Sequence, residues 1–165
     1  MGMNPPGAVF RTVSAINAWS LLLVGGLSLF GTIVMASLAG ALVSLAVAIH
    51  GALELSFRRR ILNEDGSSAA NWMALNQLGL ATTLSLYFAY QVMILDGEAV
   101  SATLMASPLA DVLLIYPEPM RSQLVEMLPF LIGIFYAIAA GVSWLVCGVT
   151  ALFYWMQRTR SDRPN

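Results

Sequence analysis

The feature that most constrains this chain is an uncharged apolar stretch that runs from residue 12 to residue 53. As one helix, at about 1.5 Å per residue, it would be roughly 60 Å long, twice the thickness of a bilayer's hydrocarbon core. Two antiparallel helices fit that thickness, so we expect a hairpin with spans at about residues 14–35 and 38–57 and a tight turn near Ala36 and Ser37. The alternative is one span followed by a helix on the membrane surface, which would move the N-terminus to the other side.

Charge is scarce throughout the chain. Of its residues, 10% are charged and 58% are hydrophobic, whereas about a quarter of an ordinary soluble domain is charged. So few charges cannot cover a water-facing surface, and lipid is therefore the expected solvent. The net charge is −1, so a general attraction to nucleic acid is not expected. The sequence predicts an all-α integral membrane protein whose main partner is the lipid bilayer.

Two further apolar segments, at about residues 72–95 and 130–156, complete a single domain of four predicted transmembrane helices. Residues 58–71 join the second and third spans. They contain an arginine triplet and a polar run with turn-forming residues, so we expect a cytoplasmic loop there. Residues 96–123 mix acidic residues and prolines with short apolar runs, which indicates an extracytoplasmic segment.

Three prolines and the polar end of the chain refine this scheme. Ser107 and Pro108 form a helix start, with serine as the cap and proline at the first position, so a short interfacial helix is expected near residues 108–116, ending at Pro117. Pro129 is expected to bend the helix that leads into the last span. Residues 157–165 are polar and are expected to form a flexible cytoplasmic tail.

The arginines fall almost entirely on one side of the four-span scheme. Only Arg121 lies on the other side. Because positive residues concentrate in cytoplasmic loops, both termini are predicted to be cytoplasmic. Arg58, Arg59 and Arg60 therefore act first as topology signals, and contact with lipid headgroups is the alternative role.

Small residues recur at helical spacing in the second and fourth spans. In lipid, helices associate mainly by the close packing of such residues. The favoured interpretation is packing within the hairpin against Gly25, Ser28 and Gly31, and the alternative is an interface between subunits. The predicted packing residues are Gly40, Ser44, Ala48, Ala52, Gly133, Ala137 and Gly141.

One ionisable pair lies inside a predicted span. His50 and Glu54 are four residues apart and so share a face of the helix. Asn17, Asn76 and Gln77 fall near the same cytoplasmic end. An ionisable residue in a membrane is a functional candidate because its burial is costly, so one hypothesis is a site for a cation, a proton or a lipid headgroup. The other hypothesis is a set of hydrogen bonds that fixes helix register.

No catalytic motif, cofactor motif or metal-ligand set occurs in the chain, and one histidine with one carboxylate is too few ligands for structural zinc. The sequence therefore favours a non-enzymatic accessory or scaffold subunit or a stress-related membrane component. The alternative is a small oligomeric transporter or channel, in which His50, Glu54 and Gln91 would face a shared water path. A membrane enzyme that acts on lipid has the least support.

The opening hairpin carries one resemblance. With Gly25-Gly26, Gly31, Gly40 and the run Gly51-Ala52-Leu53-Glu54 before a basic stretch, it resembles the repeated hairpin of HdeD-type bacterial membrane proteins. The resemblance covers about a third of the chain, and that family has more spans. It implies a small protein of the bacterial inner membrane, and it implies no site residue.

Overall fold

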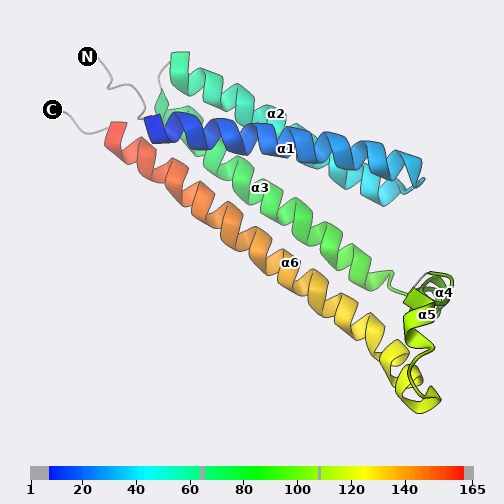
Figure 1. The fold of residues 1–165 in the computed structure, drawn as a ribbon. Helices are drawn as coiled ribbons and strands as arrows, with labels where there is room; N and C mark the ends of the chain where they lie inside the picture. Colours follow the sequence, from blue (N-terminus) through cyan, green and yellow to red (C-terminus); the bar gives the residue numbers. More distant parts are fainter. Residues whose placement is uncertain (1–7, 64–65, 108, 162–165) are drawn as a thin grey trace. The chain divides into compact units, whose positions relative to one another are not determined.

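The structure is a computed structural model, and it describes residues 8–63, 66–107 and 109–161. All of its described elements are helices (Figure 1), and they group into two compact units: unit 1 (Met1–Ser85 and Val142–Asn165) and unit 2 (Leu86–Gly141). In chain order the helices are α1 (Ala8–Val34), α2 (Leu38–Asn63), α3 (Gly66–Met93), α4 (Gly97–Met105), α5 (Leu109–Leu113) and α6 (Glu118–Ser161).

The apolar stretch folds as the expected hairpin, with α1 and α2 antiparallel and side by side (Figure 1). The turn lies at the expected place. Ala36 takes a left-handed conformation with φ of 52°, which reverses the chain in very few residues. The Ser37 hydroxyl oxygen then accepts a hydrogen bond from the Gly40 backbone N–H at 3.2 Å, so Ser37 caps the start of α2.

Close approach of backbones holds this hairpin together. A Cβ atom added at Gly25 would lie 2.6 Å from the backbone nitrogen of Ala48, and one added at Gly51 would lie 2.8 Å from the backbone nitrogen of Leu22. Neither position has room for a side chain. The two helices therefore pack at a distance that only glycine permits at these points.

The predicted packing residues of α2, which lie four residues apart, have different surroundings in the structure. Gly40 and Ser44 are buried, and Ala48 meets Gly25, but Ala52 is exposed and Gly51 makes the next contact instead. Four residues turn an α-helix through about 400°, so a four-residue repeat drifts by about 40° at each step. After three steps the stripe has rotated away from α1.

Four helix ends of unit 1 converge around an apolar cluster. The start of α1, the end of α2, the start of α3 and the end of α6 all contribute to it. Phe10 packs edge-on against Tyr154, with ring centroids 5.9 Å apart. The buried members are Phe10, Ile61, Ala69, Ala70, Met73 and Tyr154.

The connection between α2 and α3 differs from the expected loop of residues 58–71. Residues 58–63 continue α2, and α3 already begins at Gly66. Ile61 is buried in the cluster just described, which stabilises α2 beyond the end of its apolar run. Arg60 lies in the last turn of α2, where a positive charge is favourable to the helix dipole.

The segment between α3 and α6 also differs from the expectation of one short helix at residues 108–116. Two helices occur there, α4 and α5, and Pro108 lies outside the described residues. The axis of α4 makes an angle of 84° with that of α3. The Asp96 side chain caps α4 by accepting a hydrogen bond from the backbone N–H of Glu98 at 2.9 Å.

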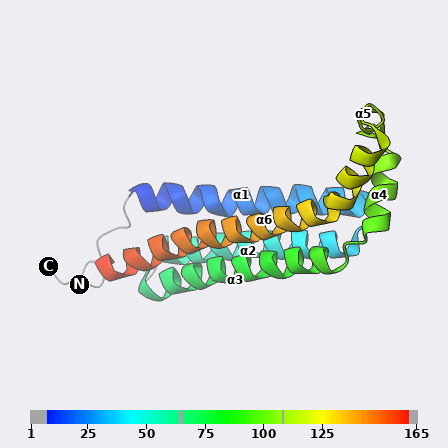
Figure 2. The ribbon, with the colours of Figure 1, turned by 90° about the horizontal axis from the view of Figure 1, so that it is seen from below.

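The last helix is longer than expected. α6 runs without a break from Glu118 to Ser161 and includes Pro129. At about 1.5 Å per residue it is roughly 66 Å long, about twice a bilayer core. Figure 2 shows that its first turns run at an angle to those that follow, as expected near a proline. Of the expected tail of residues 157–165, the part up to Ser161 is helical and the rest lies outside the described residues.

Three of the described helices are long and apolar enough to cross a membrane: α1, α2 and α6. The pair α3 and α4, bent at the short break between them, passes the same test when taken together. The described part of the chain is therefore all-helical, with three or four helices suited to a bilayer.

A buried carboxylate held by four helices

Glu54 lies on α2 in the interior of unit 1 and is 0% exposed. Three side-chain amides donate hydrogen bonds to its carboxyl group. Asn17 Nδ2 donates to Oε1 at 3.0 Å, and Asn76 Nδ2 and Gln77 Nε2 donate to Oε2 at 3.1 and 3.0 Å. Both carboxyl oxygens are thus hydrogen-bonded within the fold, as a buried polar group requires.

A fourth helix joins the network through Tyr154 of α6. Its hydroxyl group interacts with the Glu54 carboxyl group and lies 3.5 Å from Asn17 Nδ2. Glu54 therefore connects α2 with α1, α3 and α6. We call Asn17, His50, Glu54, Asn76, Gln77 and Tyr154 the polar core.

His50 lies one turn before Glu54 and joins the same network through Asn76. Its Nδ1 is 2.8 Å from Asn76 Oδ1, and its backbone carbonyl oxygen accepts a hydrogen bond from Asn76 Nδ2 at 3.0 Å. On the other side of the ring, Nε2 is 3.4 Å from Thr83 Oγ1. A Cβ atom at Gly79 would lie 3.1 Å from His50 Cε1, so the imidazole ring rests against a part of α3 that has no side chain.

Apolar layers enclose the polar core along the helices. On one side is the cluster around Phe10 and Met73. On the other side a second cluster joins α2, α3 and α6, and its buried members are Val47, Leu80, Ala81 and Cys147. Hydrogen bonds in such a water-poor layer are strengthened by the low dielectric, and an unpaired polar group there is costly.

The five polar residues predicted from the sequence thus lie together in the structure. Tyr154 and Thr83 were not predicted. Tyr154 follows the apolar run of α6 and resembles an ordinary interfacial aromatic residue, so only its burial at 0% exposure distinguishes it. The Thr83 hydroxyl group donates to the Gly79 carbonyl oxygen on its own helix, as most threonines within helices do. Its sequence context therefore gives no sign that it lies beside His50.

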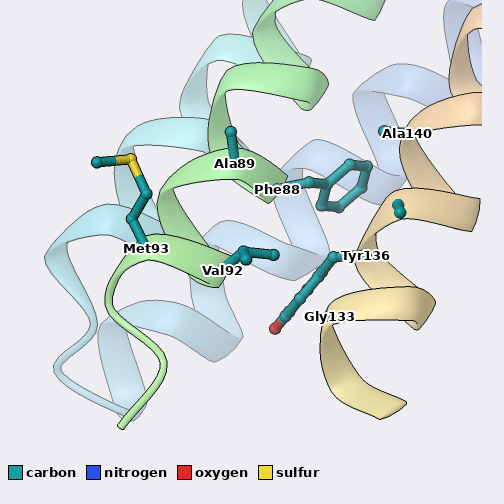
Figure 3. Close-up of a pocket in the computed structure, with 8 residues that line it drawn as sticks. Phe88, Ala89, Val92, Met93, Gly133, Tyr136 and Ala140 are labelled. Atoms are coloured by element: carbon teal, nitrogen blue, oxygen red, sulfur yellow. The ribbon is translucent and has the colours of Figure 1, made fainter. Parts of the chain in front are cut away.

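The predicted packing residues of α6 lie in different surroundings from those of α2. In unit 2, Gly133 and Ala137 line an open apolar groove of about 430 Å³ between α3 and α6. Figure 3 shows Phe88 reaching from α3 toward Tyr136, and the centroids of the two stacked rings are 5.9 Å apart. A Cβ atom at Gly141 would meet nothing within 4 Å.

The arginine triplet lies at the cluster-bearing end of unit 1. Arg59 and Arg60 are exposed. Arg58 is partly buried and donates from Nη2 to the backbone carbonyl oxygen of Arg11 at 3.5 Å. Gln91 belongs to unit 2, and its side chain donates a hydrogen bond to the Tyr87 hydroxyl group, one turn earlier on the same helix, at 2.6 Å. It takes no part in the hydrogen bonds of the polar core.

The polar core both accepts and donates hydrogen bonds. Among the residues that the structure describes, no three His, Cys, Asp or Glu side chains are grouped so that they could hold a metal ion. No protein-family model, curated protein or solved structure matches the chain. The resemblance of the hairpin to HdeD-type proteins therefore stays a prediction.

Proposed function

We propose that this chain is a non-enzymatic multi-pass protein of the bacterial inner membrane that acts through helix packing, as an accessory or scaffold subunit. The observation that carries the proposal is that both oxygens of the Glu54 carboxyl group accept hydrogen bonds from within the chain. This carboxyl group is buried, and its partners come from three other helices of the same chain. A polar residue used in this way specifies which helices pack together and in which register.

The placement in a membrane rests on apolar length and on the groups at the helix ends. Trp72 and Trp155 are 56% and 55% exposed near the cluster-bearing end of unit 1, where the arginine triplet also lies. Exposed tryptophan beside arginine is typical of a membrane interface, and the excess of arginine favours the cytoplasmic side. Because α4 is nearly perpendicular to α3, a spanning α3 would place α4 along the opposite interface.

Cysteine labelling tests this topology. In a Cys147→Ala background, Glu98→Cys is expected to react with a membrane-impermeant maleimide added outside spheroplasts, because Glu98 is exposed on α4. Ser68→Cys, exposed at the start of α3, is expected to react only after lysis. Labelling of both positions from one side would contradict four spans with cytoplasmic termini.

The alternative of an oligomeric transporter or channel would require the polar core to open to water. Glu54 is 0% exposed, and both its oxygens are bonded within the fold. These features support the packing role. Gln91, the third residue of the alternative, is bonded to Tyr87 on the next turn of its own helix.

The state of assembly in the native membrane tests the proposed function. After mild extraction, native mass spectrometry is expected to show a complex of defined stoichiometry that contains this chain and a different membrane protein. Two matched variants, Gly141→Leu on α6 and Gly26→Leu on α1, each place a large side chain on open surface. The variant that disrupts the complex identifies the helix that contacts the partner protein. A chain that stays monomeric throughout would contradict the subunit role, and a homo-oligomer that conducts ions would favour the channel.

A further inference from the structure

The orientation of the Asn76 amide is set by its partners. Its Nδ2 faces the backbone carbonyl oxygen of His50 at 3.0 Å and Glu54 Oε2 at 3.1 Å, and a carbonyl oxygen can only accept. Nδ2 must therefore be the donor, which leaves Oδ1 as the atom that faces His50 Nδ1 at 2.8 Å. An amide oxygen can only accept, so His50 Nδ1 carries a hydrogen.

The other ring nitrogen has a partner that can act in two ways. Thr83 Oγ1 is 3.4 Å from His50 Nε2 and 2.9 Å from the Gly79 carbonyl oxygen. While the hydroxyl group donates to Gly79, its lone pairs face Nε2, and a hydrogen bond forms only if Nε2 also carries a proton. With Nε2 unprotonated, the hydroxyl hydrogen must turn from Gly79 to the ring to make a bond.

We propose that His50 is a proton-binding latch between α2 and α3, in which protonation at Nε2 creates a hydrogen bond to Thr83 that the neutral ring lacks. The neutral ring carries its hydrogen on Nδ1, and the Thr83 hydroxyl group donates to the Gly79 carbonyl oxygen instead of to the ring. The protonated ring donates from both nitrogens, to Asn76 and to Thr83, and its positive charge is linked through Asn76 to the Glu54 carboxyl group. The inference takes the packing role of the polar core as its starting point and adds a response to protons.

The charged and titratable groups around the ring are few. On its own helix, Glu54 lies one turn away and Arg58 two turns away. From α6, Tyr154 and Cys147 both interact electrostatically with Glu54. The described parts of α1 and α3 in unit 1 present amides and hydroxyl groups near the ring, and the one ionisable side chain among them is Arg11 at the start of α1. Glu54 is thus the acidic partner closest to the latch in the network.

The chain contains one histidine, so selective nitrogen labelling of histidine gives the signals of His50 alone. Nuclear magnetic resonance of the full chain in detergent micelles, between about pH 5 and 8 where imidazole groups commonly titrate, reports which ring nitrogen is protonated. We expect the neutral ring in the Nδ1–H form and a second proton on Nε2 as the pH falls. A neutral ring in the Nε2–H form would overturn the latch, and so would a ring that does not change over this interval.

Two variants test the coupling. Glu54→Gln removes the acidic group that is linked to the ring through Asn76, so the share of His50 signal that carries a proton on Nε2 at the acidic end of the pH series is expected to fall, whereas the exposed control Glu98→Gln leaves that share unchanged. Thr83→Val keeps the side-chain shape and removes the partner of Nε2, so its loss of thermal stability is expected to be larger at acidic than at neutral pH. An equal loss at both pH values, or an unchanged share of the Nε2-protonated ring in a folded Glu54→Gln, would refute the coupling.

These readouts separate the latch from the proposed function. If Glu54→Gln does not fold, the tautomer in the unmodified chain and the Thr83→Val comparison still decide the matter. An Nε2–H ring in a chain that keeps its native complex would remove the latch and leave the subunit role intact. A chain that forms no complex but shows the Nδ1–H ring and the pH-dependent Thr83→Val effect would support the latch and remove the subunit role.

Discussion

Glu54→Ala is expected to destabilise the helix bundle of unit 1 by about 3 kcal/mol. The substitution removes the acceptor shared by Asn17, Asn76 and Gln77. A buried donor left without a partner costs about 1–3 kcal/mol, although amides in a membrane protein recover part of this cost by pairing with each other. Unfolding in mixed micelles with increasing sodium dodecyl sulfate, followed by tryptophan fluorescence, measures the change.

The control for this prediction is Glu98→Ala. Glu98 is an exposed acidic residue on α4, and surface substitutions usually change stability by no more than about 0.5 kcal/mol. The two variants remove the same side chain from different environments. Equal stability of both variants would mean that the polar core does not hold the helices of unit 1 together.

Gly25→Ala is expected to destabilise the α1–α2 hairpin by about 2 kcal/mol. The new methyl group would lie 2.6 Å from the backbone nitrogen of Ala48, and backbone cannot move aside as a flexible side chain can. Overpacking of this kind costs about 1–3 kcal/mol, and at the upper end it outweighs the gain of about 1 kcal/mol that alanine brings over glycine in a helix. The same unfolding measurement applies.

The neighbouring residue supplies a matched control. Gly26→Ala places the same methyl group one position along α1, where nothing lies within 4 Å. Only the helix preference remains, so a gain in stability of about 0.5–1 kcal/mol is expected. If both variants gained stability, α1 and α2 would not approach each other as closely as the structure indicates.

The polar core illustrates what a single sequence can and cannot predict about a site. His50 and Glu54 stand out because ionisable residues are rare in apolar helices, and their four-residue spacing places them on one face. The convergence of Asn17, Asn76 and Gln77 on that face depends on how three helices are rotated about their axes. Tyr154 lies a hundred residues along the chain from Glu54, and no local pattern links the two.

The connection between α2 and α3 shows a limit of another kind. Polar composition indicates that residues 58–71 do not belong in lipid, but it does not distinguish a loop from a helix that continues into water. The structure contains helix up to Asn63 and again from Gly66. Buried contacts of Ile61, Ala69 and Ala70 decide the outcome, and those contacts exist only once the helix ends have come together.

By itself, the uncharged stretch of residues 12–53 determined that this chain forms long apolar helices and that the stretch is too long for a single span. Those conclusions follow from the length of a helix and the scarcity of charge, which are local properties. The tertiary structure decided which small residues touch and which amides meet Glu54. It selected Gly51 rather than Ala52 for the hairpin contact, because small rotations of each helix, set by packing against its neighbours, determine which residues face each other.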